Sequence, residues 1–269
     1  MGDTMHPYVI CIVCSSPRCI VKSVSSADTS LRALEAIGAG QPLGVSELAR
    51  RLDVSKPAAQ RALLALSDAG WIRRSETQPG RWILTAKVLD LAGHVGEEFN
   101  LRHVALSVMS ELVDRTTESA HLAVLEGTDI VIIEDVESTQ VLRIFWPMGK
   151  RFSAYGSATG KAILSALPRD RLAACLPETL TAFTPETITD RRELETELGR
   201  IAARGYAVQY GELRSDVASV AAPICGRPNQ PLAAVSIFVP TQRFPDDHGE
   251  TFGQLVREAA DTISARLRR

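Results

Sequence analysis

The chain has 269 residues, which suits one large domain or two of ordinary size. Hydrophobic residues make up 45% and charged residues 23%, so the chain can build a core. The formal net charge is −2, and no run of about eighteen apolar residues predicts a transmembrane helix. The apolar stretch Val9–Val13 is too short for a secretory signal. The cysteines, five in number, form no regular framework, which fits a reducing cytoplasm.

The first twenty residues contain a cysteine cluster of spacing C-x2-C-x4-C. Its members are Cys11, Cys14 and Cys19, and His6 is a conceivable fourth ligand. A structural zinc site normally needs four well-spaced ligands. The alternatives are a disordered tail or a start codon assigned upstream of the one that is used. We expect residues 1–20 to be a disordered extension without a metal.

Three helices are predicted next along the chain. The first is Asp28–Ile37, with its apolar residues on one stripe. The second is Val45–Leu52, and a short turn joins it to the third, Lys56–Ala69. Ser55 can cap the start of the third helix, and Gly70 can end it. The last two helices have the lengths and spacing of a helix-turn-helix.

The third helix has two different faces at 3.6 residues per turn. Its alanines and leucines fall on one side, which predicts close packing against a neighbouring helix. Pro57, Gln60, Arg61 and Leu64 fall on the other, with Lys56 at the N-terminal end. Gln and Arg side chains can read adenine and guanine edges in a major groove. The alternative is a helical pair with a solvated charged face.

A β-hairpin is predicted directly after the third helix. Ile72–Arg74 and Arg81–Leu84 are the strands, and a polar turn ending in Pro-Gly joins them. Residues 45–87 hold eight basic and four acidic side chains, a net charge of +4 that leaves −6 on the rest of the chain. A basic module on an acidic protein favours a polyanion partner for that module alone. Helices and hairpin together predict a winged helix-turn-helix domain.

A long helical pattern begins at Thr85 and predicts a linker helix up to about residue 100, followed by the first helix of a second domain. Its apolar surface suggests a dimer contact, although it could also pack only on its own chain.

The second domain mixes strands and helices joined by short turns, which predicts an α+β domain with a largely antiparallel sheet. Its predicted strands are His121–Leu125, Ile130–Asp135, Leu142–Phe145, Tyr206–Tyr210, Ser219–Ile224 and Ala233–Val239, and its later helices are Ser157–Leu167, Arg169–Leu176, Asp190–Ala203 and His248–Arg266.

The segment Tyr155–Lys161 superficially resembles a phosphate-binding loop. Three residues instead of four stand between its glycines, and Ala162 follows the lysine, so it is not a Walker A motif. A small-residue turn that enters a helix can still bind a carboxylate through unpaired N–H groups. An ordinary helix N-terminus that binds no ligand is an equally good interpretation of this segment. No catalytic constellation stands out, and the five histidines show no metal-binding spacing.

The order and spacing of several strings resemble the IclR family of bacterial transcriptional regulators over roughly Val21–Leu267. The strings are LRALEAIGAGQPLGVSELARRLDVSKPAAQRALLALSDAGWIRR, GKRFSAYGSATGKAIL, RGYAV and VASVAAPI…PLAAVSIFVPTQRF. The resemblance implies a winged helix-turn-helix in residues 21–84, a linker helix in 85–100 and a GAF-like α/β effector-binding domain in 101–269. It also implies a homodimer or homotetramer.

The family's small-molecule site lies between the sheet and the loop before the GKA helix. Carried to matching positions, it would be lined by Val141, Ile144, Phe152, Ala158, Thr159, Gln209, Ser219, Ser236 and Phe238. The backbone and hydroxyl groups of Ala158, Thr159, Ser219 and Ser236 would hold a carboxylate. Gln209 is commonly acidic in relatives and Phe238 is commonly small or hydroxylated. These departures favour an apolar or aromatic acid over a very small hydroxy or keto acid.

The resulting hypothesis is a cytoplasmic transcriptional regulator, more a repressor than an activator, whose affinity for a palindromic or near-palindromic operator is tuned by a small organic acid. It is expected to need no cofactor and no membrane. The expected DNA contacts are Arg50, Arg51, Ser55, Lys56, Arg73 and Arg81 on phosphates, Pro57, Gln60 and Arg61 on bases, and Arg74 in addition. The alternatives are an enzyme acting on a small carboxylic acid through Lys161 or Ser157, and a pure interaction scaffold.

Overall fold

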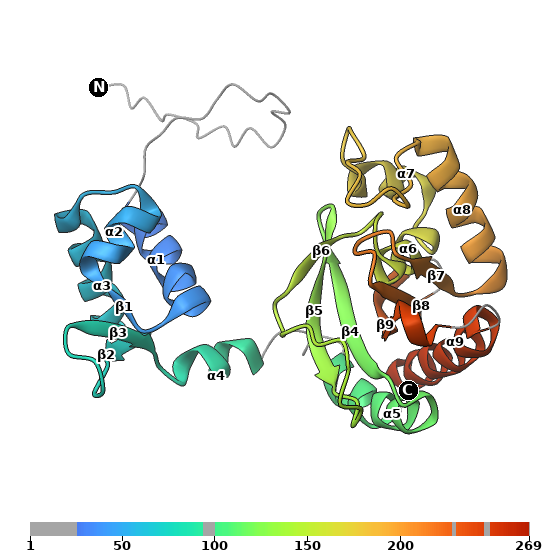
Figure 1. The fold of residues 1–269 in the computed structure, drawn as a ribbon, viewed down its shortest axis with the longest axis horizontal. Coiled ribbons are helices and arrows are strands. Elements are labelled where there is room, and N and C mark those ends of the chain that lie inside the picture. The colour runs from blue at the N-terminus through green and yellow to red at the C-terminus, as the bar shows by residue number, and fades with distance from the viewer. Residues whose placement is uncertain (1–25, 94–99, 228–229, 245–247, 269) are drawn as a thin grey trace, which may run out of the picture. The chain divides into compact units, whose positions relative to one another are not determined.

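The computed structural model describes residues 26–93, 100–227, 230–244 and 248–268, and the chain divides into two compact units at Gly93 and His94 (Figure 1). The predicted extension 1–20, with its cysteine cluster, lies outside the described residues. Within the described ranges, every helix is too short or too polar to span a bilayer.

The first unit folds as a three-helix bundle with a small sheet. Its elements are α1 (Ser26–Gly40), β1 (Leu43–Gly44), α2 (Val45–Leu52), α3 (Lys56–Asp68), β2 (Ile72–Arg74), β3 (Arg81–Leu84) and α4 (Lys87–Gly93). The sheet order is β1-β3-β2, and both strand pairs are antiparallel. Apolar side chains from α1, α2, α3 and this sheet share one core, in which Ile37, Leu48 and Leu63 are almost completely buried. The predicted winged helix-turn-helix is confirmed.

The ends of α3 follow from its sequence. The Ser55 hydroxyl accepts a hydrogen bond from the Ala58 N–H at 3.3 Å and so caps the first turn. Gly70 has a φ of +78°, a left-handed conformation that costs glycine little. Its N–H donates to Ser67 O, and the Trp71 N–H donates to Leu66 O, both at 2.9 Å. This pattern is a Schellman motif, so the predicted start and stop of α3 are both confirmed.

The second unit contains a six-stranded sheet of order β6-β5-β4-β9-β8-β7, in which every neighbouring pair is antiparallel. This confirms the predicted α+β fold with a largely antiparallel sheet. Its elements are α5 (Leu101–Thr116), β4 (Ser119–Glu126), β5 (Asp129–Val136), β6 (Arg151–Ser153), α6 (Ala158–Ser165), α7 (Arg169–Leu172), η2 (Ala173–Cys175), α8 (Arg191–Arg204), β7 (Ala207–Tyr210), β8 (Val217–Arg227), β9 (Gln230–Pro240), η3 (Thr241–Arg243) and α9 (His248–Leu267).

Helices cover the two faces of this sheet in separate layers (Figure 1). On one face, α5 and α9 pack against alternate strand residues such as Leu122 and Val235. On the other face, α6 and α8 pack against residues of the opposite parity, such as Ala123 and Ala234. The period of two along each strand assigns each side chain to one face. The second face, called the α6 face below, carries the polar residues predicted to form the effector site.

Two sequence predictions about secondary structure are wrong. Leu142–Phe145 is not a strand, and the edge strand is Arg151–Ser153 instead. Leu142 and Phe145 are more than half exposed, and Leu142 O accepts from Arg243 Nη1 at 2.7 Å rather than from a strand. The predicted helix Arg169–Leu176 is only one α-helical turn followed by a 3-10 turn.

The helical pattern predicted from Thr85 to about residue 100 is described only in part. It contains α4, and residues 94–99 lie outside the described ranges.

Candidate functional site

The exposed face of α3 carries the side chains predicted to read DNA. Ala59, Ala62, Leu63 and Leu66 are buried against the bundle, whereas Lys56, Pro57, Gln60, Arg61 and Leu64 are exposed. Ser55, at the helix start, is also exposed. This separation is what a recognition helix needs, since its polar side chains must reach the groove while the opposite side holds the domain together.

The cationic side chains predicted to contact DNA differ in their surroundings. Arg50, Lys56 and Arg61 are exposed, and none forms an ion pair with another residue in the described ranges. Arg81 is half-buried, and its Nη1 donates to Pro42 O at 2.8 Å and Glu47 Oε2 at 3.2 Å. Arg81 therefore already links the wing to the bundle.

The other three predicted cations also have partners within their own unit. Arg51 pairs with Glu47 at 2.9 Å and Arg73 with Glu76 at 3.0 Å. The Arg74 guanidinium lies 3.9 Å from the Trp82 ring centroid. These arginines are exposed, so they can exchange such partners for phosphates at low cost.

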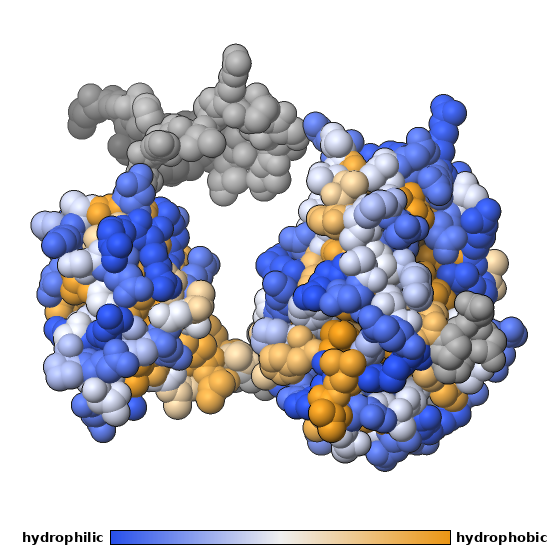
Figure 2. Space-filling model, viewed as in Figure 1, coloured by the Kyte–Doolittle hydropathy of each residue, from blue (hydrophilic) through white to orange (hydrophobic). Residues whose placement is uncertain are grey.

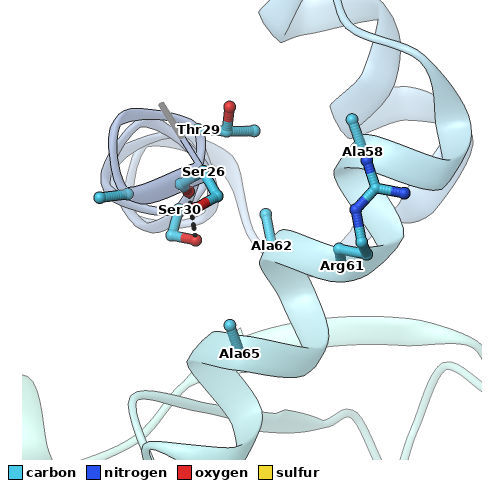
Figure 3. Close-up of a pocket in the computed structure, with 8 residues that line it drawn as sticks. Ser26, Thr29, Ser30, Ala58, Arg61, Ala62 and Ala65 are labelled. Atoms are coloured by element: carbon cyan, nitrogen blue, oxygen red, sulfur yellow. Dashed lines mark hydrogen bonds between the residues drawn. The ribbon is translucent and has the colours of Figure 1, made fainter. Parts of the chain in front are cut away.

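A groove of about 510 Å³ lies between α1 and α3, beside Arg61 (Figure 3). Small side chains line it, with Ala62 and Ala65 facing α1. Its lining residues include no buried polar atom that lacks a hydrogen bond. It does not coincide with the predicted effector residues, and two further grooves, between α5 and α9 and beside α6, α7 and α8, also lie outside them.

The N-terminus of α6 is positioned by two local features. The Ser157 hydroxyl accepts from the Gly160 N–H at 3.1 Å, and this leaves the N–H groups of Ala158 and Thr159 without helical partners. A Cβ at Gly160 would lie 2.1 Å from Ala154 O, so only glycine allows this close approach. The free N–H groups and the helix dipole suit an anion there.

Strand register brings four predicted effector residues together on the α6 face. Gln209 lies opposite Ser219, and Ser219 lies opposite Phe238. In the next same-face row, Ser236 lies between Ala221 and His121. All of these side chains are buried, and α6 packs against β7, β8 and β9 above them.

The remaining predicted effector residues on the strands and loops differ in how deeply they are buried. Phe152 of β6 is buried, and its ring centroid lies 6.5 Å from that of Phe238. Ile144 is half-buried. Val141 is 100% exposed, so the structure does not bring it together with the others.

Six buried side-chain polar atoms lack a hydrogen-bond partner in the described part of the chain. One is Trp82 Nε1 in the first unit. The other five belong to the α6 face or to the segment beside it: His121 Nδ1, Trp146 Nε1, Thr159 Oγ1, Gln209 Oε1 and Ser219 Oγ. A buried polar atom without a partner costs about 1–3 kcal/mol, so these five atoms are candidates to bind ordered water or a ligand.

Sequence reasoning missed two residues of this group, His121 and Trp146. The His121 ring lies 4.9 Å from the Phe238 ring, edge to face, and burial lowers the pKa of its imidazole from 6.5 to about 4. Trp146 contacts the Phe152 ring at 4.7 Å and lies 6.3 Å from Phe238. The period of two could have placed His121 on this face, whereas nothing in the sequence marked Trp146.

Lys161, a candidate in the enzyme hypothesis, is fully buried and paired with Glu212. Within the described ranges, no group of three or more His, Cys, Asp or Glu side chains could hold a metal ion.

A winged helix-turn-helix unit followed by an antiparallel α+β unit with a buried polar site defines a DNA-binding regulator with an effector domain. Residues 93–265 match the family model described as the C-terminal domain of the bacterial transcriptional regulator IclR, and residues 27–81 match a model of the MarR family. The chain belongs to the IclR family of bacterial transcriptional regulators.

Relatives of this chain agree with that assignment. It is 30% identical to the HTH-type transcriptional regulator KipR of Bacillus subtilis, over 84% of this chain and 90% of that protein. It is 26% identical to the transcriptional repressor IclR of Escherichia coli, over 90% and 89% of the two chains. The protein is thus a transcriptional regulator and not an enzyme.

A solved structure of an IclR homolog from Microbacterium hydrocarbonoxydans, complexed with 4-hydroxybenzoate, is also similar. Its TM-score is 0.78 at 25% identity, and the match covers 91% of this chain and 99% of that one. The likeness extends over both units.

Proposed function

We propose that this regulator, working in the cytoplasm as a homodimer or homotetramer, binds a palindromic or near-palindromic operator through α3 and represses transcription. We further propose that an apolar or aromatic organic acid binds on the α6 face and changes the affinity for the operator. Relatives named as repressors, including the Escherichia coli protein, support the direction of control.

The observation that carries the effector proposal is the set of unpartnered atoms beside the α6 N-terminus. Thr159 Oγ1 and Ser219 Oγ can both donate to a carboxylate, and the free N–H groups of Ala158 and Thr159 can add to them. The walls nearby are the aromatic rings of Phe152 and Phe238, which suit an apolar or aromatic body. The 4-hydroxybenzoate in the Microbacterium relative is an acid of this kind.

The observation that carries the DNA proposal is the exposed row of Lys56, Gln60 and Arg61 on α3. Gln60 and Arg61 would contact base edges, and Lys56 would contact phosphate. The other expected contacts are Arg50, Arg51, Ser55, Pro57, Arg73, Arg74 and Arg81.

The proposed dimer contact is α4. Leu89 and Leu91 are 71% and 61% exposed, and apolar side chains gather over this helix in Figure 2. A second copy of α4 would bury them and would place two α3 helices on one duplex.

The test is fluorescence anisotropy of a labelled duplex from the promoter of the regulated gene. Binding should fall steeply as the salt concentration rises, because phosphate contacts release counterions. It should also change when benzoate or 4-hydroxybenzoate is added. A salt-independent interaction would contradict the DNA part of the proposal, and unchanged affinity with every acid would contradict the effector part.

A further inference from the structure

Two of the arginines expected to contact phosphate share one carboxylate. Glu47 Oε1 accepts from Arg51 Nη2 at 2.9 Å, and Glu47 Oε2 accepts from Arg81 Nη1 at 3.2 Å. Arg51 stands in the last turn of α2, whereas Arg81 begins β3 and so forms the root of the wing, the hairpin of β2 and β3. Glu47 therefore connects a cation of the helix-turn-helix with a cation of the wing.

Two local features bring Glu47 within reach of both arginines. Glu47 precedes Arg51 by one helical turn on α2, which puts the two side chains on one face with the acidic residue on the N-terminal side. Arg81 pairs with Gly44 across β1 and β3, and Gly44 is the N-cap residue of α2. The register of the small sheet thus brings the wing root to the first turn of α2, where Glu47 lies.

Further contacts hold the two guanidinium groups in place. Arg81 Nη1 also donates to Pro42 O at 2.8 Å. The Arg51 guanidinium lies against Gly40, where an added Cβ would be only 2.8 Å from Nη1. The side chains of Glu47, Arg51 and Arg81 are 31%, 42% and 42% exposed, so all three are still open to solvent.

Each guanidinium keeps donors for a phosphate while it is bound to Glu47. A guanidinium carries several N–H donors in a planar fork. Among the residues that the structure describes, no acceptor bonds to Nε or Nη2 of Arg81, or to Nε or Nη1 of Arg51. Both arginines can therefore bind phosphate without giving up the carboxylate.

Glu47 has two opposite effects on DNA binding, and their sizes differ. As an anion it repels phosphates, but the two arginines beside it outweigh its charge, and salt screens exposed charges beyond about 8 Å. As a fixed acceptor it orders two long side chains before DNA arrives. Ordering one such side chain on binding lowers affinity by roughly two- to tenfold, so the gain from ordering two in advance should exceed the repulsion.

We propose that Glu47 is a positioning residue for DNA binding, and that its carboxylate holds Arg51 and Arg81 as a preformed phosphate clamp across α2 and the wing. The inference rests on the proposed function, since it needs α3 to bind a duplex. It adds to that function a residue that acts through the two arginines. Removing this acidic side chain should weaken DNA binding, although net charge alone predicts the opposite.

The experiment measures DNA binding of full-length Glu47 variants by fluorescence anisotropy, with the promoter duplex and with a labelled duplex of mixed sequence. Glu47→Gln removes the charge and keeps the shape, whereas Glu47→Asp keeps the charge and shortens the side chain. Both variants should bind the promoter duplex about fivefold or more weakly than the parent. The loss should be similar on the mixed-sequence duplex, because phosphate contacts carry no sequence information.

The matched control is Glu76→Gln in the wing. In the described part of the chain, Glu76 pairs with Arg73 alone, at 3.0 Å, and its side chain is 87% exposed. An ion pair this exposed holds neither side chain firmly. The control adds the same net charge as Glu47→Gln but leaves the clamp intact, so its affinity for DNA should equal the parent's or exceed it slightly.

Two further measurements separate positioning from a loss of structure. The slope of log affinity against log salt should become less steep by about one or two in Glu47→Gln, since phosphate contacts are weakened. Partial unfolding would instead lower the affinity by the same factor at every salt concentration. In the background Arg51→Ala/Arg81→Ala, adding Glu47→Gln should change the affinity by less than about twofold.

Several results would overturn the inference. Binding by Glu47→Gln that equals or exceeds the parent's would do so, as would the same loss from Glu47→Gln in the background without the two arginines. If Glu47→Gln does not fold, Glu47→Asp decides, because binding equal to the parent's would show that reach to both arginines is irrelevant. If the parent binds neither duplex, the proposed DNA-binding function itself is wrong, so the two failures are distinguishable.

Discussion

Lys161 Nζ lies 2.6 Å from both carboxylate oxygens of Glu212, and both side chains are buried. The pair joins α6 to the turn after β7. The Glu212 carbonyl oxygen in turn accepts from the Thr187 hydroxyl at 2.6 Å. Burial raises the pKa of Glu212, and the neighbouring Lys161 ammonium opposes that rise. The ion pair thus anchors α6, the helix whose N-terminus is proposed to bind the carboxylate of the effector.

Lys161→Met should lower the free energy of unfolding by about 3–5 kcal/mol, since it leaves a buried carboxylate without its partner. The double variant Lys161→Met/Glu212→Leu should recover much of this loss, because no charge remains buried. Urea denaturation of both variants checks this. A double variant as unstable as Lys161→Met would show that the charge pair is not the cause.

His121 should make the stability depend on pH. Its pKa is about 4 in the folded protein and 6.5 in the unfolded chain, so the unfolded chain binds more protons between these values. The free energy of unfolding should therefore fall as the pH falls from 7.5 to 5, by about 2 kcal/mol from this residue. Subtracting the pH profile of His121→Asn from that of the parent isolates the contribution. Parallel profiles would contradict a buried neutral imidazole.

Gly160→Ala should strongly destabilise the effector domain or move α6, because the new Cβ would meet the Ala154 backbone at 2.1–2.5 Å. The matched control is Gly199→Ala on α8, where a Cβ meets nothing within 4 Å. That variant should stabilise by up to about 1 kcal/mol through helix propensity. Thermal unfolding measures both. Equal effects at the two glycines would argue against the close contact.

Arg61→Ala should weaken binding to the operator by about 1–3 kcal/mol and relax base preference at one position in each half-site. Arg200→Ala removes an exposed arginine of the effector domain and should leave binding unchanged. Anisotropy titrations with the operator and with single-base variants compare the two. An Arg61→Ala protein that binds as tightly as the parent would mean that α3 is not the reading helix.

The sequence predicted the elements whose signal is local. The period of 3.6 located α2 and α3, and the cap at Ser55 and the glycine at position 70 located the ends of α3. The strand predicted at Leu142–Phe145 is wrong, because Leu142 and Phe145 are exposed and the segment pairs with no other described strand.

The proposed effector site was predictable only in part, because it depends on strand register. Four residues taken from the family resemblance, Gln209, Ser219, Ser236 and Phe238, do lie together on the α6 face. The period of two places His121 on this face, but its position beside Ser236 depends on the pairing of β4 with β9, which no sequence period specifies. Trp146 joins them from an irregular segment that carries no periodic signal at all.

We expect that binding of an acid on the α6 face changes how tightly α3 binds DNA. The measurement is the operator affinity of the parent and of Thr159→Val as benzoate, 4-hydroxybenzoate, phenylacetate or 4-hydroxyphenylacetate is titrated. At least one acid should shift the affinity of the parent by about fivefold or more, and Thr159→Val should need about tenfold more of that acid for the same shift. An operator affinity that no acid alters would contradict the proposed coupling between the α6 face and α3. So would an affinity that changes at the same acid concentration in the parent and in Thr159→Val.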